Sequence, residues 1–140
     1  MSRGLANCNP GNIRRSATRF RGEVVPSRDP AFKQFESLAW GYRALFVLFD
    51  TYRRRYGLRR LDVMIARWAP PVENDTEAYV RGLCRMTGFA PAQEIDPHDR
   101  STMLPLAAAM TRIENGAEAD AEAVAEGWRL FENSKLKIQN

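Results

Sequence analysis

The sequence predicts one α+β domain that is mainly helical, with a small β-hairpin near its start. A chain of 140 residues suits a single domain, here residues 1–140. Beyond residue 36, apolar residues recur at three- and four-residue steps in segments separated by Gly and Pro. Earlier residues lack this period. We therefore expect a loop and hairpin over residues 1–36, a helical part over 37–133, and a fraying tail over 134–140.

The first 36 residues carry turn signals rather than helical ones. The clearest turn is Asn9-Pro10-Gly11-Asn12. Further on, Phe20, Phe32 and Phe35 surround a segment that contains Pro26, Asp29 and Pro30, which are unfavourable to regular structure. This pattern indicates a short, irregular hairpin.

A long helix is predicted from about Ser37 to Tyr56. Ser37 can cap its first turn, and Gly57 can take the left-handed conformation that ends helices. Four shorter helices follow, each bounded by a cap or a helix breaker. We expect them at about residues 61–68 before Pro70 and Pro71, at 74–86 with Asn74 and Glu77 as a capping box, at 102–114 with Pro105 in the first turn, and at 119–131.

Charge divides the chain into two unlike halves. Residues 1–70 hold 14 Lys and Arg against 5 Asp and Glu, a net charge of +9, whereas residues 71–140 hold 7 against 12, a net charge of −5. A basic half indicates an anionic partner, such as nucleic acid, a membrane surface or a cell-wall polymer with peptide carboxylates.

Several function classes are disfavoured. No apolar run approaches the ~18 residues of a membrane span, and residues 1–7 lack the apolar core of a secretory signal. Cys8, Cys84 and His98 have no metal-ligand spacing, so we expect neither metal nor cofactor. The arginines at 53–55 and at 59 and 60 fit a solvated helix face, and no nucleic-acid motif accompanies them, so no nucleic-acid partner is expected.

Two glutamates are candidates for acid–base chemistry. Glu114 ends an apolar helix, where the helix dipole and neighbours such as Ile113 disfavour a charged carboxylate, as a general acid requires. Glu23 lies on the predicted hairpin, from which a carboxylate could face Glu114. The alternatives are an exposed Glu114 beside a helix cap, and a Glu23 paired with a nearby arginine.

The segment that begins at Trp68 could bind sugar. Trp68 and Tyr79 are aromatic platforms of the kind on which sugar rings stack, and Asn74 and Thr76 offer hydrogen bonds to hydroxyl or acetamido groups. Alternatively, Trp68 belongs to the core and Asn74 only caps a helix.

Motifs over residues 3–90 resemble a family of phage and prophage proteins labelled as virion structural or peptidoglycan-degrading. The resemblance is carried by Arg3-Gly4-Leu5, Asn7-Cys8-Asn9-Pro10-Gly11-Asn12-Ile13-Arg14, Gly22-Glu23, Phe32, Phe35, Ser37, Gly41-Tyr42-Arg43-Ala44, Arg67-Trp68-Ala69-Pro70-Pro71, Glu73-Asn74-Asp75-Thr76 and Tyr79. Cys8 stands where the family commonly has Asn, and Phe20 where it commonly has Trp.

A more distant resemblance is to lysozyme-like transglycosylases and glucosaminidases. In those enzymes a helix ends in the catalytic Glu, and an Asn-rich turn and a β-hairpin follow. Here the Asn-rich turn opens the chain, and the segment from Ala107 to Gly116, which contains Glu114, is similar to the missing helix. The resemblance therefore implies a circularly permuted lysozyme-like domain in which this later helix packs against the turn.

These resemblances imply a bacteriolytic enzyme that cleaves peptidoglycan glycan strands, as a lytic transglycosylase or a muramidase. Glu114 would act as general acid and base, with Glu23 as runner-up or second group. Residues expected to line the cleft are Asn9, Asn12, Trp68, Asn74, Thr76 and Tyr79. The alternative is a non-catalytic virion or wall-binding protein.

A peptidoglycan-cleaving protein without a signal peptide must be delivered to the cell wall by other means. We expect synthesis in the cytoplasm without a signal peptide and action in the periplasm or cell wall, after delivery by a virion, a holin or a secretion system. A toxin effector delivered by secretion would be accompanied by a periplasmic inhibitor or immunity protein.

Overall fold

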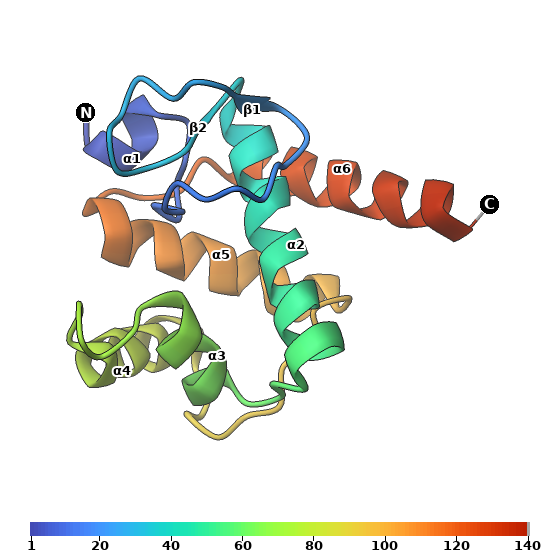
Figure 1. Cartoon of the computed structure of the whole chain (residues 1–140). Coiled ribbons are helices and arrows are strands. Elements are labelled where there is room, and N and C mark those ends of the chain that lie inside the picture. Colours follow the sequence, from blue (N-terminus) through green and yellow to red (C-terminus); the bar gives the residue numbers. More distant parts are fainter. Residues whose placement is uncertain (140) are drawn as a thin grey trace.

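A computed structural model describes the chain over residues 1–139, with side chains through Ser134 (Figure 1). Within these residues there are six helices and one two-stranded sheet. They are α1 (Arg3–Ala6), β1 (Glu23–Val24), β2 (Gln34–Phe35), α2 (Leu38–Tyr56), α3 (Leu61–Trp68), α4 (Thr76–Thr87), α5 (Arg100–Asn115) and α6 (Ala121–Gln139). The predicted mainly helical α+β class is confirmed.

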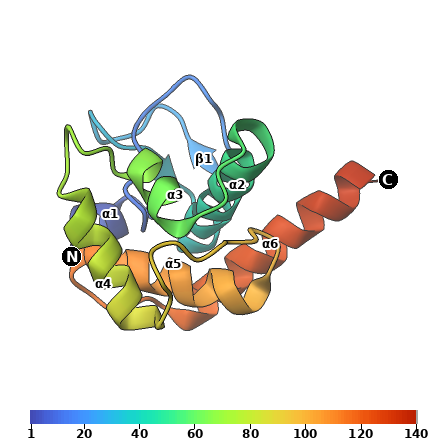
Figure 2. The same cartoon turned by 90° about the horizontal axis from the view of Figure 1, so that it is seen from below.

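The elements form two lobes joined by α2. Residues 1–36, here called the N-terminal lobe, contain α1 and the hairpin, while α3 and α4 form a second lobe at the other end of α2 (Figure 1). Helix α5 lies between the two lobes, and α6 crosses α2 on the side of the N-terminal lobe (Figure 1, Figure 2). The α3–α4 lobe and the N-terminal lobe therefore face each other across α5.

Helix α2 has the boundaries that its sequence predicts. The Ser37 hydroxyl accepts a hydrogen bond from the Trp40 amide, and Gly57 ends the helix with a left-handed φ of 65°. The helix supplies a buried stripe to the core, against which the other helices pack. The largest fully buried apolar side chains of the molecule are Tyr42, Phe35, Phe46, Phe49, Leu45, Leu61, Met64, Ile65, Leu83, Ile95 and Met103.

The hairpin is small, as predicted. Its two strands pair antiparallel, with Glu23 opposite Phe35 and Val24 opposite Gln34. An isolated bridge between Arg14 and Phe32 extends this pairing towards the turn at residues 9–12. The hairpin thereby keeps the N-terminal turn against the rest of the lobe.

The starts of α4 and α5 differ from the prediction, and so does the presence of α1. Helix α4 is capped by Asp75, whose carboxylate accepts from the Ala78 amide, and not by Asn74. Helix α5 begins earlier, because Asp99 caps it through the Ser101 amide, so Pro105 lies inside the helix beyond its first turn. Helix α1 was not predicted; Ser2 caps its single turn.

The last helix was expected to end near residue 131, but its backbone continues to Gln139. Residues 132–139 contain neither Gly nor Pro to stop the helix. The Ser134 hydroxyl also accepts from Arg43 Nε at 3.1 Å, which ties this end of α6 to α2. Asn140 and the side chains from residue 135 onward lie outside the described residues.

No described helix combines the length and the apolar character that crossing a bilayer requires.

Helices α2 and α6 pack closely because Gly127 lies at their crossing. A Cβ at this position would stand 2.5 Å from the Tyr42 Cβ and 2.8 Å from the Ala39 carbonyl oxygen. Next to it, the Phe46 and Trp128 rings meet edge to face with centroids 5.0 Å apart. The absence of a side chain at Gly127 therefore allows the two helices to approach this closely.

We expect Gly127→Ala to destabilise the fold by about 1–2 kcal/mol. Overpacking costs ~1–3 kcal/mol, and the better helix propensity of Ala returns only ~1 kcal/mol. Urea unfolding followed by circular dichroism measures the change, and Glu122→Ala on the exposed start of α6 serves as the control, with a shift within about 0.5 kcal/mol. An unchanged or raised stability of Gly127→Ala would show that the helices can move apart freely.

Candidate active site

A cleft of about 300 Å³ lies between the two lobes. The N-terminal lobe forms one wall, the end of α3 and the loop towards α4 form the other, and α2 and the last turn of α5 contribute one or two residues each. Its lining residues are Gly11, Asn12, Ile13, Arg14, Phe32, Leu48, Tyr52, Arg67, Trp68, Ala69, Pro70, Glu73, Asn74 and Glu114.

The Glu114 carboxyl is held in the cleft by two hydrogen bonds from opposite lobes. Asn12 Nδ2 donates to Oε1 at 3.0 Å, and the Tyr79 hydroxyl donates to Oε2 at 2.8 Å. Burial raises the pKa of Tyr79 well above its ordinary value, and the charge and hydrogen bond of Glu114 raise it further. Tyr79 therefore stays protonated and acts as a donor, so the orientation of the carboxyl is fixed from both sides.

The end of α5 is fastened to the start of the chain. Asn115 Nδ2 donates to the Pro10 carbonyl at 2.8 Å, and the Ser2 hydroxyl donates to Asn115 Oδ1 at 2.7 Å. Gly4 makes this approach possible, because a Cβ there would lie 2.5 Å from Asn115 Oδ1. The structure thus brings the Asn-rich turn and the glutamate-bearing helix together.

Aromatic side chains provide flat apolar surface in the cleft. Trp68 is half-buried and stacks on Phe49 of the core, with ring centroids 5.6 Å apart and 24° between the planes. The N-terminal turn comes close to this ring at Gly11, where a Cβ would stand 2.5 Å from Trp68 Cζ2. Tyr52 and Phe32 line the same cleft. Trp68 is therefore both a support of the core and a wall of the cleft.

A second carboxylate, Glu73, also lines the cleft. It lies in the loop before α4 and forms an ion pair with Arg14 of the N-terminal lobe, with Nε and Oε2 3.3 Å apart. Sequence reasoning did not select Glu73 or Arg14 as site residues. The nearby Trp68 was a signal for this region, but nothing in the spacing distinguished Glu73 from an exposed loop residue.

Glu23 does not line the cleft. Its carboxylate lies 3.0 Å from Lys33 Nζ, and the side chains of Glu23 and Lys33 are only 7% and 1% exposed. The Phe20 amide also donates to Glu23 Oε1. This buried pair holds the hairpin together, so Glu23 and Glu114 are not brought into one site.

Of the other predicted site residues, two support the backbone and one lies at the rim. Asn9 is buried, and its amide bonds to the backbone of Ile13 and Lys33. The Thr76 hydroxyl donates to the Ala69 carbonyl at 2.6 Å. Asn74 lines the cleft, and its amide donates to the Pro70 carbonyl. Asn12, Trp68, Asn74 and Glu114 are thus the predicted residues that share the cleft, with Tyr79 directly behind Glu114.

Among the described residues, no three His, Cys, Asp or Glu side chains are grouped as metal ligands. Cys8 and Cys84 are free thiols.

A comparison with known proteins finds a phage relative. The chain is 36% identical over 119 residues to Protein P5 of Pseudoalteromonas phage PM2, across 83% of this chain and 72% of the phage protein. The chain belongs to the family of phage PM2 protein P5. No family model matches the sequence. The predicted relationship to phage proteins is confirmed by this relative.

The N-terminal wall of the cleft is stabilised by Asp29, whose side chain is 7% exposed. Arg3 donates to both of its oxygens, at 2.6 and 2.7 Å. The hydrogen bond from Arg3 is the main reason why the pKa of Asp29 lies well below its usual range. Hydrogen bonds from the amides of Ala31, Asn7 and Phe32 lower this pKa further, while desolvation of the carboxyl raises it. Asp29 thereby connects α1 to the loop that carries Phe32.

The lowered pKa of Asp29 predicts loss of stability in acid. A carboxyl with a lower pKa in the folded state stabilises that state above its unfolded pKa of ~3.9, and this contribution disappears as the pH falls below about 4. We expect Asp29→Asn to have a lower Tm than wild type at pH 7 and a shallower decline from pH 5 to 2. Thermal unfolding across this range measures both, with Asp62→Asn on the surface of α3 as the control. Equal acid sensitivity of wild type and Asp29→Asn would contradict the assignment.

Proposed function

We propose that this protein is a lysozyme-like glycosidase that cuts the glycan strands of bacterial peptidoglycan, with Glu114 as general acid and base. The observation that carries the proposal is a single carboxyl, oriented by Tyr79 and Asn12, in an aromatic-lined cleft between two lobes. A cleft open along the lobe boundary suits a polymer that must pass through the site.

The walls of the cleft match the chemistry of an amino sugar. Trp68, Tyr52 and Phe32 put aromatic surface into the wall of the cleft, which suits the C–H groups of a pyranose, while the Asn74 amide and the Arg67 guanidinium offer donors to hydroxyl and acetamido oxygens. The cleft thus combines apolar and aromatic surface with polar groups that can fix the orientation of a ligand, as ligand sites do.

In the proposed reaction, protonated Glu114 donates its proton to the oxygen that links N-acetylmuramic acid to N-acetylglucosamine. The bond from the muramyl C1 to that oxygen breaks, and positive charge develops at C1 and the ring oxygen. The Glu114 carboxylate that results then accepts a proton from the attacking nucleophile.

Asn12 is suited to both protonation states of Glu114. Its Oδ1 is buried and lacks a hydrogen-bond partner among the described residues, while Nδ2 donates to Glu114. Rotation of the amide by 180° would turn Oδ1 towards Glu114 Oε1, where it could accept from a protonated carboxyl. Because an orphaned buried oxygen costs ~1–3 kcal/mol, the protonated state would relieve a strain present in the ionised one.

The nucleophile decides the type of enzyme. If the muramyl 6-hydroxyl attacks C1 and gives its proton to Glu114, a 1,6-anhydro sugar forms and the enzyme is a lytic transglycosylase. If a water held by Glu73 attacks, a reducing end forms and the enzyme is a muramidase. Glu73 lines the same cleft as Glu114 and takes the place that the sequence suggested for Glu23.

The lysozyme-like fold and its circular permutation belong to the same proposal. They are supported by the packing of α5, which carries Glu114, against the turn at residues 9–12, with the hairpin next in the chain. We also propose action in the periplasm or cell wall, after delivery by a virion, a holin or a secretion system, with an inhibitor protein as partner.

A non-catalytic phage wall-binding or virion protein is the second candidate. Both Glu114 oxygens are already bonded within the protein, and the ion pair from Arg14 to Glu73 spans the cleft, as in a site that serves structure. In that case the carboxyl would stabilise the junction of the two lobes without reacting.

We expect Glu114→Gln to release at least ~100-fold less product from purified peptidoglycan than wild type, because general acid–base catalysis contributes ~10²–10⁴-fold. Tyr79→Phe, which removes one donor to the carboxyl, should lose about tenfold. Mass spectrometry of the soluble products gives the rates, and their anhydro or reducing ends name the reaction. Glu118→Gln, on the exposed loop after α5, is the matched control and should cut like wild type.

Thermal unfolding of the same variants separates the two candidates. Loss of activity in Glu114→Gln with a nearly unchanged Tm supports catalysis. A folded wild type that releases no product would establish the non-catalytic protein, and an active Glu114→Gln would remove Glu114 from the mechanism.

Glu73→Gln tests the identity of the nucleophile. If Glu73 positions the water, this variant should lose at least ~100-fold of the reducing-end product. Should the products carry anhydro ends instead, Glu73→Gln is expected to retain activity within about threefold, because the internal hydroxyl needs no second carboxylate. Chromatography of borohydride-reduced products distinguishes the two results.

A further inference from the structure

A second and larger concavity, of about 980 Å³, adjoins the cleft of Glu114. It shares Ile13, Leu48, Tyr52, Arg67 and Pro70 with that cleft, so the two form one continuous surface. It extends along α2 towards the hairpin side of the N-terminal lobe. We call this concavity the arginine groove, since its charged lining residues in the described structure are five arginines: Arg19, Arg21, Arg43, Arg55 and Arg67.

Among the described residues, none of the five arginines of the groove has a carboxylate partner. Ion pairs elsewhere in the described structure engage arginines with Asp or Glu, as in Arg3–Asp29 and Arg53–Glu94, but none of them includes an arginine of the groove. Five positive charges around one concavity repel each other unless an anion is present.

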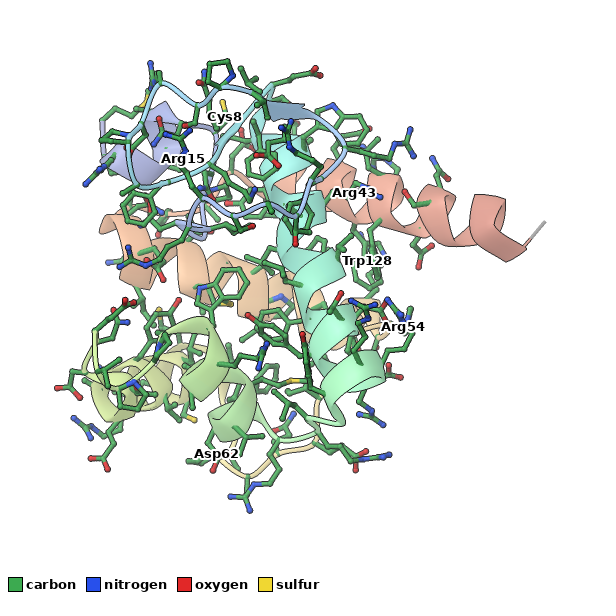
Figure 3. All side chains as sticks on the ribbon, in the orientation of Figure 1. Cys8, Arg15, Arg43, Arg54, Asp62 and Trp128 are labelled. Atoms are coloured by element: carbon green, nitrogen blue, oxygen red, sulfur yellow. The ribbon has the colours of Figure 1, made fainter. Side chains whose placement is uncertain are left out.

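Arg43 is the most demanding of these groups. Its residue is 8% exposed, and Nε donates to Ser134. Burial lowers the pKa of Arg43, and the charge of Arg21 lowers it further, so the two guanidinium groups lie close enough to repel. In Figure 3, Arg43 is seen on α2 next to α6. Arg43 has no counter-charge among the described side chains, so an external anion would stabilise this buried cation.

Aromatic rings hold two parts of the groove in place. Arg21 and Arg43 both lie over Trp40, with their Cζ atoms 5.6 and 5.9 Å from its ring centroid. Arg67 lies over Tyr56 at 3.8 Å and over Tyr52 at 5.6 Å. Contact through the flat face of a guanidinium leaves its N–H edge available, and that edge matches a carboxylate in two-point geometry.

We propose that the arginine groove binds the carboxylates of a peptide arm carried by the glycan strand in the neighbouring cleft. This inference rests on the proposed function. An acidic peptide fits better than a nucleic-acid backbone because the groove also offers apolar wall to alkyl side chains, from Val47, Leu58 and Val63. Its position beside Glu114 places the peptide arm on the sugar next to the bond that is cut.

The test measures binding and does not depend on catalysis. In the full-length Glu114→Gln protein, calorimetry compares a disaccharide that carries a stem tetrapeptide with the same disaccharide without peptide. We expect the peptide-bearing probe to bind at least tenfold more tightly. In Arg21→Gln/Arg55→Gln this preference should fall below threefold, with affinity for the bare disaccharide retained. The charge-matched control Arg85→Gln/Arg100→Gln, away from the groove, should keep the full preference.

Each other outcome overturns the inference. Equal affinity for the two probes, or a preference that survives in the Arg21→Gln/Arg55→Gln protein, would show that the groove takes no peptide. Tighter binding of a duplex DNA, lost in the same double variant, would assign the groove to nucleic acid. Digestion of bare glycan strands by wild type reports separately on the proposed function, since it can succeed while the peptide preference fails.

Discussion

The junction between the end of α5 and the first turn of the chain is the contact on which the site depends. Asn12 with Glu114, Pro10 with Asn115, and Ser2 with Asn115 are pairs separated by 102, 105 and 113 residues. Closing so long a loop has an entropic cost that grows only slowly with length, so the few hydrogen bonds here need the packing of α2 against α5 and α6 to support them. Without this junction, the N-terminal wall of the cleft would not be held against the helix that carries Glu114.

The two glutamates selected from the sequence show that environment, and not residue type, separates structure from chemistry. Glu23 meets Lys33 with little exposed surface on either side chain, and the paired charge stabilises the hairpin. Glu114 receives only neutral donors, from Tyr79 and Asn12, and borders an open cleft. A carboxyl whose partners are neutral can change its charge without breaking an ion pair, which is what acid–base catalysis requires.

Local signals in the sequence were sufficient for most helices but not for the site. Ser37, Gly57, Gly88 and Gly116 mark their helix ends because a cap or a left-handed residue acts within one turn. Asp75 replaced Asn74 as cap because adjacent polar residues compete for that position. The partnership of Glu23 with Lys33 forms within the N-terminal lobe, and Glu73 is held in the cleft by its contact with Arg14 of the opposite lobe; no local pattern encodes either contact. The resemblance to lysozyme-like enzymes, by contrast, led to Asn12 and Glu114, which the structure brings together.

The charge asymmetry of the chain has two physical origins in the structure. Part of the positive charge in residues 1–70 is neutralised in place, as Arg3 is by Asp29 and Arg53 by Glu94. Another part, on Arg21, Arg43 and Arg67, lies over Trp40, Tyr52 and Tyr56, whose ring faces orient guanidinium groups without cancelling their charge. Folding stability alone would favour the first arrangement, because uncompensated like charges in a concave surface raise the energy of the folded state. The arginines that the described structure leaves unpaired beside the cleft of Glu114 are therefore best explained by an anionic ligand that occupies both the arginine groove and the cleft.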